Sequence, residues 1–324
     1  MNRTLAVLMD PIAAIHPEKD STLAMLLEAQ RRGYEILYAL QNGLAIRGGE
    51  PWASLAPLEV RDDEANWFTL GKPGWRNLST IDVILARKDP PFDDQFLYDT
   101  MLLELAEMNG ALVVNRPQGL RDANEKLFSL HFPQCTPPTL IARDAAEIRR
   151  FAAEHGEVVL KPLDGMGGRS IFRSRHHDPN LNVILETLTD NGRNFCAAQR
   201  FIPEITAGDK RILMIDGEPV PYALARVPQG DDFRGNLARG GRGVGVPLSE
   251  RDRWIAAEVG PELKRRGMLF VGLDVIGAYL TEINVTSPTC IRELDAQFGL
   301  NIAGQLFDAI ERGDPRSGGA AAAK

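Results

Sequence analysis

Cysteine is scarce in this chain of 324 residues, which has three at scattered positions and no C-x-x-C spacing. A sparse, odd count of this kind argues against a disulfide framework or a zinc site and is typical of a reduced, cytoplasmic protein. No apolar run approaches the roughly 18 residues that a membrane span needs, and the N-terminal residues lack a signal-peptide layout. We therefore expect a cytoplasmic protein with no membrane segment.

Positive charge is also in deficit. The chain has 37 Lys and Arg against 44 Asp and Glu, a net charge of −7. Nucleic-acid-binding domains are typically basic, so this balance argues against a nucleic-acid partner. It does not argue against a phosphorylated ligand, because a few local arginines can bind one inside an acidic protein. With 44% hydrophobic and 25% charged residues, the composition is that of an ordinary globular protein of two or three domains.

Two common nucleotide motifs are absent, although the stretch KPLDGMGGRSIF begins with Lys161 and contains a glycine-rich turn. A P-loop has its lysine after the glycines, followed by Ser or Thr. The glycines here also do not fit the dinucleotide pattern G-x-G-x-x-G. Taken alone, the stretch is as compatible with a plain turn between two strands as with a phosphate site.

The first third of the chain predicts an α/β domain. The strand-like LAVLM, a helix capped by Asp20 or Ser21 and stopped by Gly33, and the strand-like YEILYAL form a βαβ unit with a parallel sheet. IDVILAR and ALVVN supply further strands around the helical pattern FLYDTMLLELAEMNG. We predict a Rossmann-like N-terminal domain over residues 1–122. The residues after its first strand contain no glycine, so a dinucleotide site is not expected there.

The second region opens with RDANEKLFSLHF, which has a helical pattern. Short strands separated by turns follow, among them TLIAR, VVLKPL, RSIF, CAAQRFI and KRILMID, with a hairpin tip at Asp216-Gly217. Residues 227–246 are rich in Gly and Arg, and their apolar residues do not recur with the period of a helix or a strand. A loop this long inside a domain is usually a lid or disordered. A helix and the two strands of LFVGLDVIGAYLTEINV complete the region, and residues 314–324 read as a flexible tail.

The last two strands carry an acidic pattern. Glu282 and Asn284 are two residues apart on one strand, so they point to the same face. Asp274 joins that face if the connecting loop has three residues, and points away if it has two. Oxygen ligands from Asp, Glu and Asn suit Mg²⁺. The alternative is an ordinary solvated hairpin face.

Several basic residues precede or follow the glycine turn. Any one of them is more often a surface charge than a ligand, but arginines in a lid can close over a bound anion and exclude water. The coincidence of lysines, a glycine turn, an arginine-bearing lid and an acidic hairpin favours an anion site with a divalent cation. The residues concerned are Lys126, Lys161, Arg211, Arg226, Arg234, Arg239 and Arg242.

With these motifs in place, the second region resembles the ATP-grasp fold, in which two α+β subdomains hold ATP between them. Over roughly residues 1–312 the chain resembles the bacterial-type glutathione synthetases. The stretches that carry the likeness are LLEAQRRGYE, RKDPPFD, LRDANEKLF, LKPLDGMGG, DGEPVPY, GNLARGGRG, GLDVIG and TEINVTSPTCIRE. The resemblance implies an ATP-grasp domain over residues 123–313 with a lid at 227–246.

The resemblance also implies roles for individual residues. The residues expected to bind ATP are Lys126, Lys161, Gly165, Met166, Gly167, Gly168, Gln199, Arg200, Phe201, Ile202 and Asp209. The expected ligands of Mg²⁺, or of Mn²⁺, are Asp274, Glu282 and Asn284. The expected catalytic arginines are Arg211 and Arg226, the peptide-binding residues are Arg87, Ser287, Pro288 and Thr289, and the lid residues are Arg234, Asn236, Arg239 and Arg242. We expect Cys290 to be a small buried structural residue.

The implied reaction is the ATP-dependent joining of γ-glutamylcysteine to glycine through an acyl phosphate, which yields glutathione, ADP and phosphate. The family also implies a homotetramer. Two alternatives remain open on the same fold: a carboxylate–amine ligase that joins different amino acids, and a non-catalytic ATP-binding scaffold.

Overall fold

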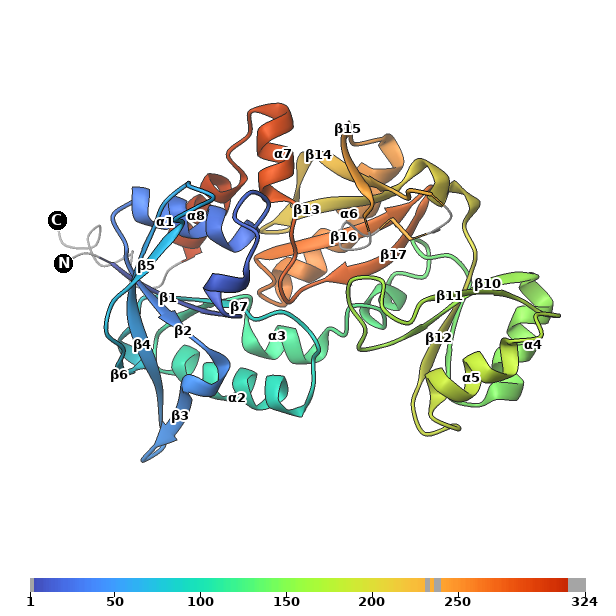
Figure 1. Ribbon diagram of the computed structural model, residues 1–324, viewed down its shortest axis with the longest axis horizontal. Helices are drawn as coiled ribbons and strands as arrows, with labels where there is room; N and C mark the ends of the chain where they lie inside the picture. Colours follow the sequence, from blue (N-terminus) through green and yellow to red (C-terminus); the bar gives the residue numbers. More distant parts are fainter. Residues whose placement is uncertain (1–2, 231–233, 236–239, 314–324) are drawn as a thin grey trace.

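A computed structural model describes residues 3–230, 234–235 and 240–313 (Figure 1). Three sheets follow one another along an elongated molecule, with the N-terminal sheet at one end and a small sheet flanked by two helices at the other (Figure 1). An antiparallel sheet, whose first strand is β13 (Asp209–Ile215) and whose last is β17 (Tyr279–Asn284), lies between them (Figure 1). The predicted lid residues Asn236 and Arg239 and the predicted tail 314–324 lie outside the described residues.

The N-terminal sheet has a parallel core in the order β2–β1–β7–β8. These strands are β1 (Thr4–Met9), β2 (Glu35–Ala39), β7 (Val83–Arg87) and β8 (Leu112–Val114). Helices α1 (Ser21–Arg31) and α2 (Asp94–Met108) make the crossovers. The Asp20 carboxylate caps α1 by accepting from the Leu23 N–H at 2.6 Å, and Gly33 leaves the helix at φ +84°. The predicted βαβ unit is confirmed.

An antiparallel extension is added at the β2 side of this core, in residues that carried little sequence signal. Its strands are β3 (Leu44–Arg47), β4 (Glu50–Val60), β5 (Phe68–Leu70) and β6 (Gly74–Asn77). Short 3-10 turns lie before and between the strands of the N-terminal region, at η1 (Ile12–Ala14), η2 (Gln41–Gly43) and η3 (Leu78–Thr80).

The helix predicted over RDANEKLFSLHF is wrong. The chain forms α3 (Pro117–Asp122), breaks, and then makes the 3-10 turn η4 (Phe128–His131). The break has a local cause, because the Asn124 side-chain oxygen accepts from the N–H groups of Lys126 and Leu127, both at 3.1 Å. Such side-chain bonds compete with the helical ones.

The small sheet is antiparallel in the order β11–β10–β12–β9, and it packs on two helices around a core of its own. Its elements are β9 (Thr139–Ala142), α4 (Ala145–His155), β10 (Glu157–Pro162), β11 (Phe172–Arg175), α5 (Leu181–Thr189) and β12 (Cys196–Arg200). The strand predicted at RSIF begins instead at its last residue, because Gly167 and Gly168 adopt positive φ and the turn continues beyond them.

The β13–β17 sheet runs in the order β15–β14–β13–β16–β17. After η5 (Pro203–Ala207) its elements are β13 (Asp209–Ile215), β14 (Glu218–Val227), β15 (Arg242–Pro247), α6 (Glu250–Arg265), β16 (Phe270–Ile276) and β17 (Tyr279–Asn284). The Asp216-Gly217 hairpin is confirmed, with both residues at positive φ. Because β15 pairs with β14, the two ends of the predicted lid, Val227 and residues 242–246, belong to paired strands.

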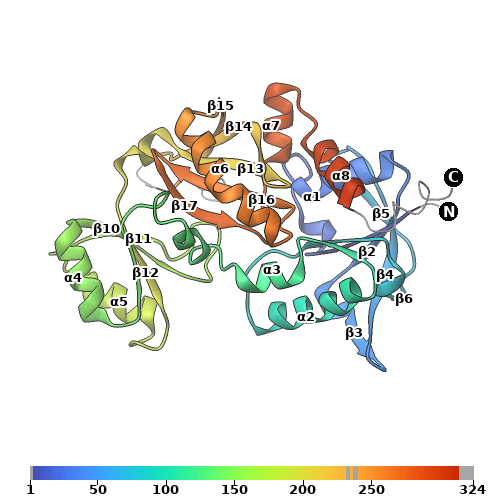
Figure 2. The ribbon, with the colours of Figure 1, turned by 180° about the vertical axis from the view of Figure 1, so that it is seen from behind.

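The last two helices, α7 (Ile291–Phe298) and α8 (Ile302–Gly313), return to the N-terminal region. In the view from behind, α8 lies beside α1 (Figure 2). Arg32 joins them through ion pairs with Asp308 at 2.7 Å and Glu311 at 2.9 Å, and Tyr34 packs edge-on against Phe307. Among the described residues, no helix is both long and apolar enough to cross a membrane.

Candidate active site

Two adjoining pockets open where the three sheets meet. The central pocket contains most of the residues singled out in the sequence, namely Lys126, Lys161, Gly165, Met166, Gly167, Gly168, Arg211, Arg226, Asp274, Glu282, Asn284, Ser287, Pro288 and Thr289. The second pocket is lined by Gln199, Arg200, Phe201, Ile202, Asp209 and Arg234, among others. Lys161, Asp274 and Glu282 line both pockets, so the acidic hairpin forms their common wall.

The acidic hairpin has a two-residue loop, yet Asp274 lies on the same face as Glu282, which the sequence led us to expect only for a three-residue loop. Its loop has two residues, because Ile276 pairs with Tyr279. The register then shifts after Val275, and this irregularity places Asp274 opposite Glu282. An extra residue on one strand of a pair is a β-bulge, which re-aims the side chains beyond it. Asp274 therefore shares the pocket face with Glu282 and Asn284 despite the short loop.

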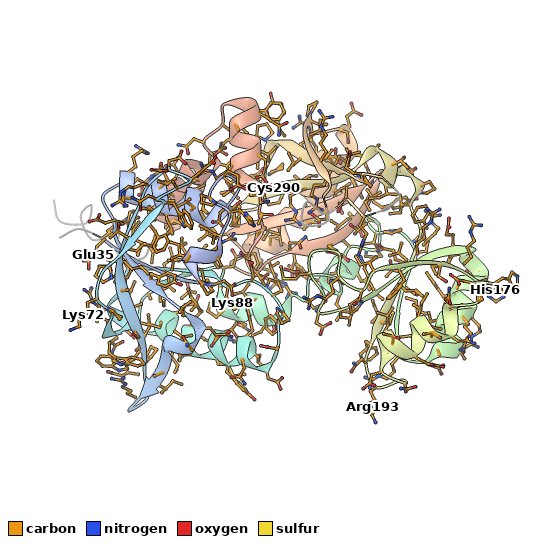
Figure 3. All side chains as sticks on the ribbon, viewed as in Figure 1. Glu35, Lys72, Lys88, His176, Arg193 and Cys290 are labelled. Atoms are coloured by element: carbon orange, nitrogen blue, oxygen red, sulfur yellow. The ribbon has the colours of Figure 1, made fainter. Side chains whose placement is uncertain are left out.

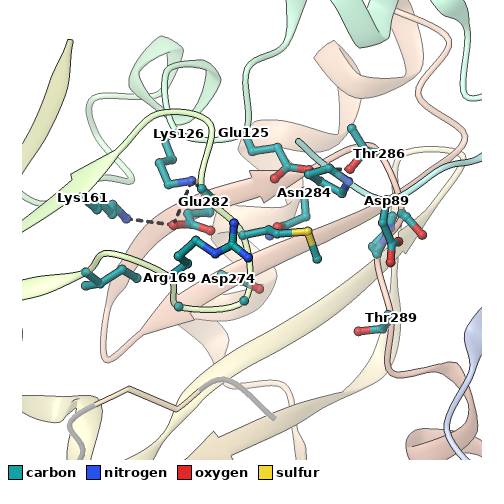
Figure 4. Close-up of a pocket in the computed structure, with 18 of the residues that line it drawn as sticks. Asp89, Glu125, Lys126, Lys161, Arg169, Asp274, Glu282, Asn284, Thr286 and Thr289 are labelled. Atoms are coloured by element: carbon teal, nitrogen blue, oxygen red, sulfur yellow. Dashed lines mark hydrogen bonds and ion pairs between the residues drawn. The ribbon is translucent and has the colours of Figure 1, made fainter. Parts of the chain in front are cut away.

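Two lysines converge on Glu282 from different elements. Lys161, near the end of β10, places its Nζ 3.0 Å from Glu282 Oε1, and Lys126 places its Nζ 4.0 Å from the same oxygen (Figure 4). Both lysines are about 5% exposed. Burial would raise the pKa of Glu282, but the two lysines outweigh it and hold this pKa below its usual value.

Asp274 is held by two arginines. Arg211 on β13 binds it through two bonds, at 2.5 and 2.9 Å, and Arg226 on β14 reaches it at 2.9 Å. Burial opposes ionisation, but the two guanidinium groups hold the pKa of Asp274 far below its usual value. Arg226 also binds Asp209, whose pKa is nevertheless raised to about 6, chiefly by burial. The pocket floor is thus a buried network of alternating charges.

The glycine turn forms a cover over this floor. Lys126 donates from Nζ to the Gly165 carbonyl at 2.7 Å, and the lid residue Arg234 donates from Nη1 to the Gly168 carbonyl at 2.7 Å. The lid also touches the floor, since Gly235 packs so closely on Arg226 that a Cβ there would lie 2.1 Å from the Arg226 carbonyl oxygen. The glycine turn and the lid therefore meet each other above the charged strands.

The second pocket offers unused polar groups. The N–H groups of Arg200 and Phe201 are bonded to Pro138 and Glu157, whereas that of Ile202 has no partner among the described residues. Asp209 Oδ1 is buried and likewise has no hydrogen-bond partner within them. A buried acceptor of this kind calls for a donor, and the described residues do not supply one.

Two of the predicted site residues that the structure describes line neither pocket. Arg87 is fully buried behind the 287–289 turn, donating to the Thr22 hydroxyl at 3.0 Å and the Pro288 carbonyl at 2.9 Å. Burial lowers its pKa to about 10. Arg242 begins β15 and is exposed. Arg87 therefore supports the turn rather than facing the pocket, and its predicted contact with a peptide stays a prediction.

Comparison with known proteins identifies the family. A family model for the prokaryotic glutathione synthetase N-terminal domain matches residues 4–121, and one for the prokaryotic glutathione synthetase ATP-grasp domain matches residues 125–299. The chain belongs to the prokaryotic glutathione synthetase family. It is accordingly an ATP-grasp ligase, as the sequence resemblance implied.

Relatives named glutathione synthetase match along nearly the whole chain. The protein of Xanthomonas campestris pv. campestris is 68% identical over 97% of this chain and 99% of its own length. That of Pseudomonas aeruginosa is 62% identical over 96% and 98%. Among solved structures, D-cycloserine synthetase DcsG aligns with a TM-score of 0.66 at 19% identity, covering 95% of this chain and 99% of its own. The structural likeness shows the shared fold.

The central pocket presents oxygen donors of the kind that a hard divalent cation takes. Glu282 and Asn284 present carboxylate and amide oxygens from one strand face, and Asn284 is anchored by donating from Nδ2 to the Gly272 carbonyl at 3.3 Å. Asp274, by contrast, uses both oxygens on arginines. Within the described residues, no group of three or more His, Cys, Asp or Glu is arranged to hold a metal. Two protein ligands still fit Mg²⁺, which usually takes one or two carboxylates plus phosphates and water.

Several pocket residues of this family member were not predicted from sequence. Asp89, Glu125, Arg169 and Thr286 all line the central pocket (Figure 4). Glu125 accepts from the Thr286 hydroxyl at 2.9 Å, and burial raises its pKa. The signal in the sequence was that Glu125 adjoins Lys126. Glu125 was missed because a continuous helix was predicted there and the break at Asn124 was not.

Cys290 is a buried residue at the start of α7, in the interior of the molecule (Figure 3). Burial raises the pKa of its thiol to about 11. A neutral, buried thiol is a poor nucleophile, which agrees with the structural role expected for it.

Proposed function

We propose that this chain joins γ-glutamylcysteine to glycine with ATP, through an acyl phosphate, giving glutathione, ADP and phosphate. The observation that carries the proposal is the common wall of the two pockets. Lys126, Lys161, Arg211 and Arg226 converge there on the acidic hairpin, next to a pocket with unused hydrogen-bonding groups. Such a wall suits a nucleotide whose base lies in one pocket and whose phosphates reach the other.

In this proposal ATP lies across both pockets. The Ile202 N–H and Asp209 Oδ1 have no hydrogen-bond partner in the part of the chain that the structure describes. The Ile202 N–H would bond the adenine ring, and Asp209 Oδ1 would accept from a ribose hydroxyl. Lys126 and Lys161 would neutralise the phosphates from above the floor, and residues 165–168 would fold over them. The glycines suit close backbone approach to a ligand.

The chemistry requires an activated carboxylate. A free carboxylate is a poor acyl donor because its leaving group would be oxide, whereas an acyl phosphate releases phosphate. Charge builds on the transferred phosphoryl group and then on the tetrahedral oxyanion, so catalysis depends mainly on fixed positive charges and positioning. Arg211 and Arg226, which are bound by Asp274 and Asp209, line the central pocket where the phosphoryl group would be transferred.

The divalent cation, Mg²⁺ or Mn²⁺, would be held by Glu282 and Asn284 with Asp274 behind them, and it would neutralise phosphate charge during the transfer. The residues of the lid, including Arg234, would keep water from the acyl phosphate. Residues 287–289, supported by Arg87, would hold the dipeptide.

The domain limits at 122 and 313 and the homotetrameric assembly also remain proposals. The test of the function is phosphate release on adding γ-glutamylcysteine, glycine or both to the full chain with Mg²⁺ and ATP. We expect rapid release only with both amino-acid substrates. If phosphate is released only with a different pair of amino-acid substrates, the chain is another carboxylate–amine ligase. If ATP binds but no pair of substrates releases phosphate, the chain is a binding scaffold.

A further inference from the structure

Asn115 is a buried side chain that lines neither pocket. It follows β8, at the junction of the N-terminal sheet and the β13–β17 sheet, and is 4% exposed. Its amide makes three short hydrogen bonds to the backbone of the neighbouring sheet. Oδ1 accepts from the Phe270 N–H at 2.8 Å, and Nδ2 donates to the carbonyls of Phe270 and Val285, both at 2.7 Å. One side chain thus ties the start of β16 to the residue after β17.

These bonds lie where the strand ladder stops. The pairing of β16 with β17 ends at Gly272 and Asn284. Beyond that pair, the Val285 carbonyl is taken by Asn115, and the Val285 N–H donates to Glu125 Oε1 at 3.3 Å. Both backbone groups of Val285 are therefore held by side chains from outside the hairpin.

The position of Val285 gives these contacts a consequence. It lies between Asn284, a pocket residue, and the pocket-lining turn at 286–289. A shift of Val285 would rotate Asn284 away from its anchor on the Gly272 carbonyl. Groups that orient a metal ligand without touching the metal typically change metal affinity by about 10- to 100-fold when they are removed.

We infer that Asn115 is a positioning residue, which fixes Val285 and thereby aims the Asn284 amide at the divalent cation of the phosphate site. The inference rests on the proposed function, because it takes Glu282 and Asn284 as the ligands. The N-terminal sheet would thereby take part in metal binding, although none of its residues lines the central pocket that holds Glu282 and Asn284.

The chain contains a matched control for this claim. Gln30 makes the same kind of amide clamp on Val60, donating from Nε2 to its carbonyl and accepting from its N–H, both at 2.9 Å. Val60 ends β4, and neither residue lines the two pockets. Asn115→Asp and Gln30→Glu each keep the side-chain shape and turn the donor that faces a carbonyl into an acceptor.

The experiment measures ADP binding to the full chain by calorimetry, with Mg²⁺ or Mn²⁺ and with EDTA. We expect Asn115→Asp to weaken metal-dependent ADP binding by about tenfold and to leave metal-free binding unchanged. Gln30→Glu should change neither, although both substitutions lower the melting temperature. The inference would be overturned if Asn115→Asp lost ADP affinity equally with metal and with EDTA. It would also be overturned if Asn115→Asp and Gln30→Glu had the same ADP affinities.

If Asn115→Asp does not fold, Asn115→Ser keeps one donor and is compared with Gln30→Ser in the same titration under the same two criteria. The outcome is separable from that of the proposed function. ADP titration needs no peptide substrate, so a failed ligation assay with the unaltered chain contradicts the function, whereas a missing metal dependence of the Asn115 effect contradicts the positioning role.

Discussion

The floor and the cover of the central pocket are built on opposite principles. The floor, made of β13, β14, β16 and β17, carries its functional charges on paired strands, and each charge is matched by a neighbour. The cover, made of the glycine turn and the lid, presents glycines and backbone carbonyls, and among its described residues Arg234 donates to the Gly168 carbonyl. The floor is held together by ion pairs between strands, whereas the described part of the lid meets the floor through the close approach of Gly235 to the Arg226 backbone.

Substitution in the floor should have the largest effect. Glu282→Gln keeps the shape of the side chain but removes the charge that faces Lys161 and the proposed cation. We expect metal-dependent turnover to fall on the order of 100-fold while the chain stays folded at neutral pH, because the hairpin pairing is kept. Steady-state rates over a range of Mg²⁺ concentrations measure this. The matched control is Glu262→Gln, an ion-paired surface position, and an unchanged rate for Glu282→Gln contradicts the metal assignment.

Substitution in the cover should have a smaller and different effect. In Gly235→Ala the new methyl group would collide with the Arg226 carbonyl, and the backbone there cannot move aside easily. We expect ligation to fall roughly tenfold, with ATP affinity retained and a larger share of ATP hydrolysed without product. The ratio of phosphate to peptide product reports this uncoupling.

Gly230→Asn serves as the control in the same loop. Gly230 has φ +63°, and a Cβ added to it would have no atom of the described residues within 4 Å. Asn tolerates this backbone region better than most other residues do. If Gly230→Asn uncouples the reaction as strongly as Gly235→Ala, the docking of Gly235 on the floor is not what closes the site.

The smallest expected effect is on stability at low pH. The pKa of Glu282 is lowered in the folded chain, because Lys161 and Lys126 outweigh burial. A lowered folded-state pKa gives stability that is present above the unfolded value of 4.5 and is lost as pH falls below it. Urea unfolding should therefore show that the free energy of unfolding falls more between pH 6 and pH 4 in the unaltered chain than in Glu282→Gln. An equal fall in both proteins would argue against the charge network.

Local features of the site were more accessible to sequence reasoning than contacts between distant segments. Period-two patterns marked Glu282 and Asn284, and Gly and Asp marked the 216–217 turn, because these features are local. The bulge that brings Asp274 to the same face has no local signature, since it depends on pairing between strands. The break at Asn124, the burial of Arg87 behind the 287–289 turn and the Asn115 clamp likewise depend on contacts between distant segments. The roles of the residues in catalysis came from family resemblance, and they stay predictions.

The central claim is that the carboxylate of the dipeptide is phosphorylated before the amine attacks. The most direct test uses γ-glutamylcysteine labelled with ¹⁸O in its cysteinyl carboxylate, with ATP, Mg²⁺ and glycine. We predict that one labelled oxygen passes to each phosphate released, because the bond from carbonyl carbon to that oxygen is the one that breaks. Phosphate without label, formed together with the peptide product, would contradict the claim.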